Sequence, residues 1–571
     1  MTGTATHPTA TGTTGPVPDD ATGAVPDDVT DGVTGGVTGG VTDTDVIIVG
    51  AGPVGVMLAG ELRLAGVRCV VLEKESDPTD QSRALGFTAR TIEVFDQRGL
   101  LPRFGGFETI PIGHFGGVRL DYREVEGGSY GAKGVPQSLT VAVLTAWARE
   151  LGADIRRGWQ VTGFTAGQDT VEVTAAGPGG VRRLRASWLV GCDGGRSTVR
   201  KLGGFAFPGH DATLEMSFAE VVGCTVRPRP NGERVPGGLV LAFQQGQDIF
   251  RVTYHERGVV PRPDETGAPS FEEVAAAWQR LTGEDISGGT PRWIGRFTDT
   301  TRQADTYRRG RVLLAGDAAH IHLPIGGQGM SAGIQDAVNL GWKLAAEVHG
   351  RAPRGLLDTY HSERHPVGAR VLVNTLTQRT LYISGPEMQP LREVFAELAA
   401  YPDVRRHLIG MVTGLDIRYD VTGTDENGSA DGGGGGGVED DHPLLGRRLP
   451  DRELVDDSGT LSCRRTPELL HTARGVVLDL AGTTDVATAA APWADRVDTV
   501  CATPLPAGVP DTFDGAEALL IRPDGYIAWV GTKDHPTDGL TTALTRWFGH
   551  PTTTSRAAGT AGDQTAADGE E

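Results

Sequence analysis

A glycine-rich turn near the start of the chain constrains the fold more than any other feature of the sequence. In VIIVGAGPVGVMLAGELRLAG, residues 46–66, three glycines within six positions join a short apolar run to a regular apolar stripe. The run at 45–49 is largely β-branched and predicts a buried parallel strand, and the stripe predicts a helix that stops at Gly66. The run RCVVLEK at 68–74 predicts a second strand. The opening of the chain therefore predicts a complete βαβ unit.

Glycine is needed at each of these three positions for a different physical reason. Gly50 allows the sharp exit from the strand, Gly52 lets the backbone approach a pyrophosphate, and Gly55 lets the helix pack closely on the strand. The helix start offers free N–H groups and the positive end of its dipole to phosphates. Glu73 ends the second strand, where a carboxylate can accept hydrogen bonds from ribose hydroxyls. The unit predicts a dinucleotide site but does not distinguish FAD from NAD.

Two later segments repeat the pattern of a strand that ends in a polar turn. LVGCDGGRSTVRK, residues 189–201, carries Asp193 after a strand-like run, and RVLLAGD, residues 311–317, ends in Gly316 and Asp317. A strand that ends in such a pair turns abruptly, because glycine tolerates backbone angles that other residues avoid. Both segments therefore predict turns that directly follow strands.

A second glycine-rich loop, PIGGQGM at 324–330, precedes a helical pattern at 331–348. The apolar positions predict that one face of this helix is buried, formed by Ile334, Val338, Trp342 and Ala345. Pro324 lacks an N–H and stiffens the loop. A helix that starts near Gly329 directs its positive dipole end at whatever lies before it.

The motifs GAGPVG, DGGRSTVR and GDAAHIHLPIGGQGM, in this order and spacing, resemble those of the single-component flavoprotein aromatic hydroxylases, the p-hydroxybenzoate hydroxylase class. The segments at 75–105, 134–158 and 356–372 resemble, more narrowly, the bacterial aromatic-polyketide hydroxylases and within them the angucycline oxygenases. The likeness covers nearly all of residues 45–551 apart from a glycine-rich stretch. Val141 and Ser331 stand where the family often has Glu and Asn, and Ser331 is a short polar residue that can still cap the helix.

The resemblance implies that the first loop binds the FAD pyrophosphate, that Asp317 holds the ribityl chain, and that the loop of Pro324 lies beside the isoalloxazine ring. It also implies that Arg83 contacts FAD and that Gln137 contacts its ribose–phosphate side; an exposed loop arginine and a helix-cap residue are the alternatives. The expected cofactor-binding residues are Gly50, Gly52, Pro53, Val54, Gly55, Glu73, Lys74, Arg83, Gln137, Asp193, Gly316, Asp317, Pro324, Gly327, Gln328, Gly329 and Met330.

The activity that the resemblance implies is that of an FAD- and NADPH-dependent (or NADH-dependent) monooxygenase. It would hydroxylate a polycyclic aromatic polyketide of the angucycline type through a flavin C4a-hydroperoxide formed with O2, in antibiotic biosynthesis. The flavin is the reactive group, so no protein side chain is expected to be catalytic. Baeyer–Villiger oxygen insertion on a related polyketide and a non-catalytic flavoprotein or interaction scaffold remain alternatives. The oxidised ring position and the choice between NADPH and NADH stay open.

A β-sheet roof over the ring is expected at 204–294, again from the resemblance. His114, Tyr254 and Trp293 are candidate substrate contacts, with core packing as the alternative for each. His320 and His322 lie two positions apart without a third ligand nearby in the sequence, so no metal site is expected.

The expected fold class is α/β, with a Rossmann-like FAD-binding domain, a β-sheet substrate domain and a C-terminal thioredoxin-like domain. Residues 1–43 contain no Lys, Arg or aromatic residue and cannot bury enough surface to offset their ordering entropy. RPDGYIAWVG at 522–531 predicts a hairpin. The expected organisation is a disordered tail at 1–43, a discontinuous FAD-binding domain at 44–203 and 295–381, a substrate domain at 204–294, a helical connection at 382–421, a glycine-rich linker at 422–441, a thioredoxin-like domain at 442–551 and a disordered tail at 552–571.

The amino-acid composition and net charge exclude several classes of binding partner. A net charge of −20 over 571 residues argues against nucleic acid. No apolar run approaches the roughly 18 residues of a membrane span, and no secretory signal is recognisable. The five cysteines are scattered without a CxxC pair, which favours a reducing cytoplasm and gives the C-terminal domain no redox role. We therefore expect a cytoplasmic monomer or homodimer that acts on a small aromatic polyketide without a membrane partner.

Overall fold

In the computed structural model, the described residues are 42–106, 108–245, 248–262, 267–422, 442–455, 464–504, 513 and 515–551. The expected tails at 1–43 and 552–571 and the expected linker at 422–441 lie almost entirely outside these residues. Among the described helices, none has the length and apolarity needed to cross a bilayer.

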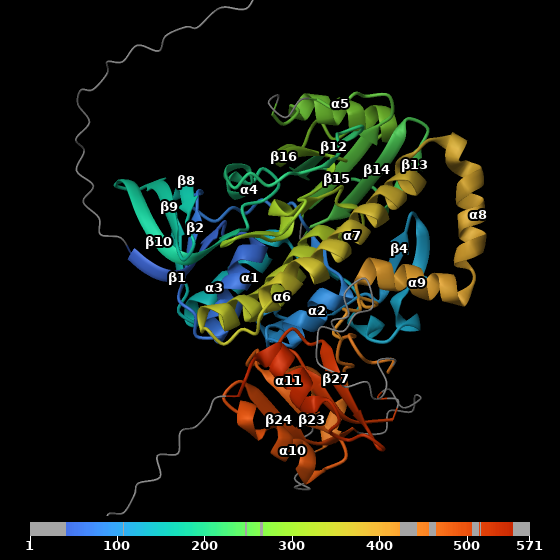
Figure 1. Cartoon of the computed structure of the whole chain (residues 1–571). Helices are drawn as coiled ribbons and strands as arrows, with labels where there is room; N and C mark the ends of the chain where they lie inside the picture. Colours follow the sequence, from blue (N-terminus) through green and yellow to red (C-terminus); the bar gives the residue numbers. More distant parts are fainter. Residues whose placement is uncertain are drawn as a thin grey trace, which may run out of the picture. The chain divides into compact units, whose positions relative to one another are not determined.

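The predicted βαβ unit is confirmed and forms the centre of a mixed sheet (Figure 1). α1 (Pro53–Leu64) connects β1 (Thr42–Val49) to β2 (Cys69–Glu73), and β1 pairs in parallel with β2 on one side and with β10 (Gly180–Gly191) on the other. The sheet order is β18 (Arg308–Arg309), β19 (Val312–Leu314), β10, β1, β2 and β7 (Asp154–Arg157). In addition, β9 (Val171–Gly177) pairs antiparallel with β10, and β8 (Gln160–Ala166) pairs antiparallel with β9. Because β1, β10 and β19 run parallel, the three turns predicted from the sequence follow neighbouring strand ends.

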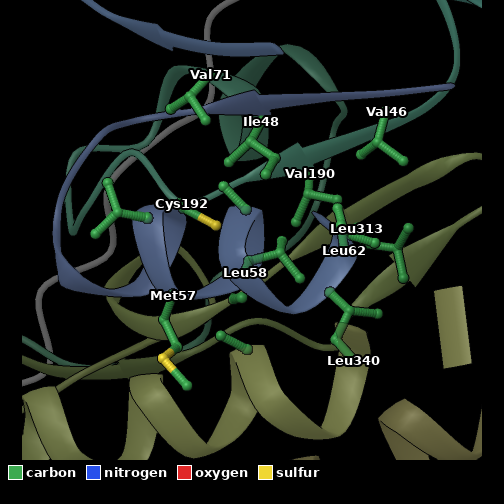
Figure 2. Packing of buried hydrophobic residues seen from close by; sticks show 14 of the residues in the cluster. Val46, Ile48, Met57, Leu58, Leu62, Val71, Val190, Cys192, Leu313 and Leu340 are labelled. Atoms are coloured by element: carbon green, nitrogen blue, oxygen red, sulfur yellow. The ribbon is translucent and has the colours of Figure 1, made fainter. Parts of the chain in front are cut away.

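The main core lies where α1 is enclosed between this sheet and α6 (Gln328–Val348) (Figure 2). Ile48 on β1, Leu58 on α1 and Leu340 on α6 are each fully buried. The expectation of one apolar face on α6 is too narrow, because every residue from Ser331 to Ala345 is buried. α6 packs against α1, α2 (Ala89–Asp96) and α7 (Thr359–Ile383), so its polar positions are enclosed as well.

The strands expected in the middle of the chain form a second, antiparallel sheet. Its order is β13 (Arg229–Val235), β14 (Gly238–Gln244), β15 (Ile249–Glu256), β12 (Glu215–Val222) and β16 (Thr290–Thr298). α5 (Phe271–Thr282) packs on this sheet through the buried Trp278, and a capping box of Ser270 and Glu273 starts the helix.

The C-terminal part carries a mixed sheet in the order β24 (Val497–Cys501), β23 (Gly475–Asp479), β26 (Ala516–Ile521) and β27 (Ile527–Thr532), with β23 and β24 parallel. α10 (Thr484–Ala490) and α11 (Leu540–Phe548) pack on it. The predicted hairpin is confirmed as β26–β27. Its turn is closed by hydrogen bonds from Gly525 N–H to Arg522 O and from Arg522 N–H to Tyr526 O.

Smaller elements complete the described chain. The remaining helices are α3 (Gln137–Glu150), α4 (Thr198–Leu202), α8 (Gln389–Ala399) and α9 (Pro402–Thr413). The remaining strands are β3 (Gly86–Phe87), β4 (Ile112–Phe115), β5 (Val118–Asp121), β6 (Lys133–Gly134), β11 (Gly209–His210), β17 (Thr301–Gln303), β20 (His320–Ile321), β21 (Glu453–Val455), β22 (Arg464–Arg465) and β25 (Thr503–Pro504).

Candidate functional site

The first glycine turn has the close approaches that its sequence predicts. Gly50 has a φ of +102°, and a β-carbon on it would lie 2.5 Å from the carbonyl oxygen of Cys192. A β-carbon on Gly55 would overlap the carbonyl oxygen of Gly50. In contrast, a β-carbon on Gly52 would meet nothing within 4 Å, and among the described residues no side chain caps the start of α1. Open space therefore lies directly before an uncapped helix start, where an anion is favoured.

The GD turn packs against the same helix start. Val54 on α1 would come within 2.8 Å of a β-carbon on Gly316 and within 2.7 Å of one on Gly333. Two motifs more than 250 residues apart in the sequence therefore form one corner. Asp317 is exposed at this corner, and its carboxylate accepts no hydrogen bond from any described residue. A ligand bound at the start of α1 would find this carboxylate free.

A buried carboxylate on α6 fixes the GD turn. Asp336 accepts hydrogen bonds from Gly316 N–H at 3.1 Å, from His320 Nε2 at 2.8 Å and from Arg364 Nε at 2.7 Å. Burial alone would raise the pKa of Asp336, but the charges of Arg364 and His320 lower it. The sequence analysis missed Asp336, whose only signal is a carboxylate within a helix rich in apolar and small residues.

The DG segment follows β10, the strand between β1 and β19, and reaches the same corner. The carboxylate of Asp193 accepts hydrogen bonds from the N–H groups of Thr198 and Val199, so it shapes the turn into α4. Arg200, from this short helix, is buried and donates to the carbonyl oxygen of Ala318 at 3.0 Å. This contact links the second motif to the third.

Among the other residues expected to bind the cofactor, Glu73 contacts the first glycine turn and Gln137 contacts the loop of Arg83. Glu73 accepts hydrogen bonds from Ala51 N–H at 2.7 Å and from Glu75 N–H at 3.0 Å, so it already braces the first glycine turn. Arg83 is exposed. Gln137 is the first residue of α3, and its Oε1 accepts a hydrogen bond from Ala84 N–H at 3.2 Å. The last contact couples the expected Gln137 site to the loop of Arg83.

Lys74 is exposed beside Glu75, and their side chains lie 3.5 Å apart. Pro53 is the first residue of α1, and its side chain is buried.

The residues of the second glycine-rich loop differ in exposure, and the loop leads directly into α6. Pro324 and Gly327 are exposed, Gly329 and Met330 are half-buried, and Gln328 is buried. α6 begins at Gln328, one residue before the expected start, and Gly327 is its N-cap. The suggestion that Ser331 caps this helix is wrong, because Ser331 Oγ instead accepts a hydrogen bond from Thr88 N–H at 3.2 Å at the start of α2.

A cavity of about 740 Å³ lies between the β4–β5 hairpin and β13. Its walls include the β4–β5 hairpin with His114 and Arg119, β13 with Asn231 and Arg234, and Tyr382 near the end of α7. Tyr382 also packs in one apolar cluster with Leu323, next to Pro324. The cavity is large enough for a molecule of several fused rings.

Two polar atoms at this cavity lack partners among the described residues, His114 Nδ1 and the Tyr382 hydroxyl. The two rings lie 5.3 Å apart between centroids. Burial lowers the pKa of His114 and raises the pKa of Tyr382 to about 12, so both side chains are neutral at pH 7. Sequence reasoning missed Tyr382, for which no motif gives a signal.

The other two candidate substrate residues lie elsewhere. Tyr254 is 7% exposed in the core cluster that contains Trp278, where core packing accounts for it. Trp293 on β16 makes an edge contact with Phe218 and lies under the Arg251 guanidinium, 5.1 Å from the ring centroid. We therefore retain His114 as the substrate candidate.

His320 and His322 do not share a ligand. His320 pairs with Asp336, and His322 Nδ1 donates to the carbonyl oxygen of Leu323 at 2.8 Å. Among the described residues, no group of three or more His, Cys, Asp or Glu side chains could hold a metal ion.

In comparison with known proteins, two parts of the chain match protein families. Residues 43–375 match the family described as "FAD binding domain", and residues 442–551 match "Aromatic-ring hydroxylase, C-terminal". The 12-dehydrotetracycline 5-monooxygenase/anhydrotetracycline 6-monooxygenase of Streptomyces rimosus is 44% identical over 534 residues, covering 89% of this chain and 99% of that protein.

Two further matches extend over the same share of the chain. The rifampicin monooxygenase of Streptomyces venezuelae is 44% identical over 520 residues, which cover 89% of this chain and 99% of that protein. The crystal structure of CabE, an aromatic hydroxylase from angucycline biosynthesis, superposes with a TM-score of 0.82 at 54% identity, covering 89% of this chain and all of that one.

Proposed function

The chain belongs to the FAD-binding aromatic-ring hydroxylases, and from that premise we propose that it hydroxylates a polycyclic aromatic polyketide of the angucycline type in antibiotic biosynthesis. It uses FAD, NADPH or NADH, and O2. The observation that carries the proposal is the corner at the start of α1, where open space at Gly52 meets the exposed carboxylate of Asp317.

The residues at this corner fit FAD. The uncapped start of α1 would hold the pyrophosphate, and Asp317 would accept hydrogen bonds from ribityl hydroxyls. The ring would lie beside Pro324, where the start of α6 favours negative charge. When bound, FAD supplies the oxygen-activating chemistry, and the protein supplies placement and electrostatics.

The substrate residues act by binding and by excluding water. The cavity between the β4–β5 hairpin and β13 would enclose the fused rings, and the unpartnered His114 Nδ1 and Tyr382 hydroxyl would bond to phenol or quinone oxygens. Burying an unpaired polar atom is unfavourable, so a ligand oxygen that pairs with it gains binding free energy. Because His114 is neutral at pH 7, it offers this bond without placing a charge beside the reacting ring.

Incubation of the purified protein with NADPH, air and a panel of angucyclinones tests the reaction. We expect a product 16 mass units heavier that retains its carbocyclic rings, separated by chromatography and identified as a phenol. A lactone of the same mass would favour Baeyer–Villiger insertion instead. A yellow protein that never oxidises NADPH with any of these compounds would favour the non-catalytic scaffold.

The proposal also covers the fold of the C-terminal domain, the domain boundaries and the setting in which the enzyme works. The C-terminal domain is thioredoxin-like, which the order of its strands and the parallel β23–β24 pair support, and it associates rather than reacts. The domain boundaries are those expected from the sequence, except that the substrate domain extends to Thr298, because β16 pairs with β12 over Thr290–Thr298. The enzyme works in the cytoplasm as a monomer or homodimer, without nucleic acid or membrane, which its acidic charge and few cysteines support.

A further inference from the structure

Three buried amide side chains form a continuous chain of hydrogen bonds between the cavity and the Pro324 loop. Gly116 N–H, in the turn of the β4–β5 hairpin, donates to Gln378 Oε1 at 3.2 Å. Gln378 Nε2 donates to Asn374 Oδ1 at 2.9 Å, and Asn374 Nδ2 donates to Gln328 Oε1 at 2.9 Å. Gln378 and Asn374 are 0% exposed and Gln328 is 4% exposed. We call these three side chains the amide relay.

The relay has a direction that its first bond determines. A backbone N–H can only donate, so Gly116 fixes which end of the Gln378 amide is the acceptor. Each following amide must then accept from one neighbour and donate to the next. Gln328 Nε2 is the last group, and it is a buried donor without a partner among the described residues.

The free end of the relay lies against the Pro324 loop. A β-carbon on Gly326 would stand 3.1 Å from Gln328 Nε2 and 3.3 Å from Gln378 Nε2. Gly326 also has a φ of +72°, which disfavours any other residue. The absence of a side chain at this position lets two amides of the relay contact the loop directly.

A second connection holds the middle of the relay. Asn374 Nδ2 also donates to the carbonyl oxygen of Met411 on α9 at 3.1 Å. The relay therefore joins four elements, the β4–β5 turn, α7, α9 and the start of α6. Because each hydrogen bond of this buried network fixes the orientation of the next amide, a shift at one end is resisted at the other.

We propose that Gln378, Asn374 and Gln328 are positioning residues that hold the substrate-cavity hairpin and the Pro324 loop at a fixed separation, and that the free Gln328 amide donates to a carbonyl-type acceptor of the bound flavin ring. The residues touch the loop and the hairpin turn, so they act through these elements. The fixed separation sets the distance between the ring of the substrate and the ring that oxidises it.

Hydrogen exchange measured by mass spectrometry tests the coupling. In Gln378→Met and in Gln328→Met, which cut the relay at opposite ends, we expect amide exchange to rise about fivefold in both 112–121 and 324–331, because each variant loses at least one buried hydrogen bond of the relay. Gln335→Met is the matched control, since Gln335 is a buried glutamine of α6 outside the relay, and its side chain donates a hydrogen bond to Thr91 Oγ1 at 3.4 Å. The control should change neither segment.

The exchange experiment can also refute the coupling between the two segments. If Gln328→Met loosened 324–331 but left 112–121 unchanged, the two segments would be independent and the coupling would be refuted. Gln328→Met alone decides this point if Gln378→Met fails to fold, because its effect on the distant hairpin is the diagnostic one.

Flavin affinity tests the free donor. Gln328→Glu keeps an oxygen for Asn374 but replaces the free N–H group by an acceptor, whereas Gln328→Met removes it. By fluorescence titration with FAD, we expect Gln328→Glu to bind about tenfold more weakly than Gln328→Met, because two acceptors would then face each other. Equal affinities would refute the donor role.

The inference rests on the proposed function in naming FAD as the ligand at this loop. The exchange experiment can be done without FAD, so its failure leaves the function untouched. A wild-type protein that binds no FAD in the titration would instead refute the proposed function.

Discussion

Glu363 on α7 and Arg522 in the C-terminal hairpin turn form a buried bidentate ion pair. Arg522 Nη1 lies 2.6 Å from Glu363 Oε1, and Nη2 lies 2.8 Å from Oε2. The side chain of Arg522 is 0% exposed and that of Glu363 is 5% exposed, and Lys343 on α6 adds a third bond to Glu363 at 2.7 Å. The C-terminal part of the chain is therefore fastened to α7 and, through the contact of Lys343 with Glu363, to α6, whose start faces the expected flavin.

Removing the Glu363 carboxylate from this cluster should lower the free energy of unfolding. In Glu363→Ala, Arg522 and Lys343 remain buried without their shared partner, and we expect a loss of about 3–5 kcal/mol in the free energy of unfolding. Thermal or urea unfolding measures it. Glu397→Ala on the exposed face of α8 is the control and should change stability by less than about 0.5 kcal/mol. Equal effects of the two changes would contradict the role of the cluster.

The same carboxylate gives stability a pH dependence. Burial alone would raise the pKa of Glu363, but Arg522 and Lys343 lower it from its ordinary value of 4.5 to about 2. The folded pKa is below the unfolded one, so the contribution is present above pH 4.5 and is lost as the pH falls from 4.5 towards 2. Urea unfolding at several pH values in this window should show a shallower slope in Glu363→Gln. An unchanged slope would exclude Glu363 as its source.

Asp317 should be needed to retain FAD. Asp317→Ala removes the exposed carboxylate at the glycine corner, and losing a charge-assisted hydrogen bond of about 1.5–3 kcal/mol weakens binding about 10- to 100-fold. Flavin absorbance per protein after purification and a fluorescence titration measure the effect. Asp403→Ala, on the exposed first turn of α9, is the control. Undiminished flavin in Asp317→Ala would count against the site.

Gly52 should tolerate a side chain for folding but not for the cofactor. Its β-carbon position is open within 4 Å and its φ is −74°, so Gly52→Val should fold, yet the side chain would fill the space expected for the pyrophosphate. We expect unchanged thermal unfolding of the FAD-free protein and loss of FAD binding. Gly163→Val is the matched control, because the β-carbon position on this strand is also open and no cofactor is expected there. Normal FAD binding by Gly52→Val would move the pyrophosphate elsewhere.

His114 should affect the substrate and not the cofactor. Losing one neutral hydrogen bond of about 0.5–1.5 kcal/mol in His114→Phe should raise KM about 2- to 12-fold, with FAD affinity unchanged. Burial lowers the pKa of His114, so an acid limb in kcat/KM should lie below the ordinary histidine value of about 6.5 and should disappear in His114→Gln. A limb that persists in His114→Gln would belong to another group.

Local patterns were sufficient for the elements that carry the motifs. The βαβ opening, the strands before the DG and GD turns, the long helix after the second glycine loop and the C-terminal hairpin all follow from hydrophobic period and turn chemistry. The need for glycine at Gly50 and Gly55 was likewise readable, because the close backbone approaches are made within the unit itself or to the strand beside it.

Long-range partners could not be read from the same patterns. The helical period of α6 predicts one apolar face, but it does not say that Asp336 meets Arg364, that Lys343 meets Glu363, or that the helix is enclosed on all sides. Tyr382 and the amide relay carry no motif, because a tyrosine or glutamine on a helix is ordinary until its neighbours are known.

The sequence by itself determined the nucleotide-binding unit, since short spacings fix local backbone geometry, and the resemblance of its motifs to those of known proteins indicated the family and the expected cofactor. Only the tertiary structure decided which turns share a corner, which of the candidate aromatic residues lies at the cavity, and how the cavity wall is tied to the Pro324 loop. The reason is that a buried polar group is stable only when a partner is brought to it, and here the partners come from segments far apart in the chain.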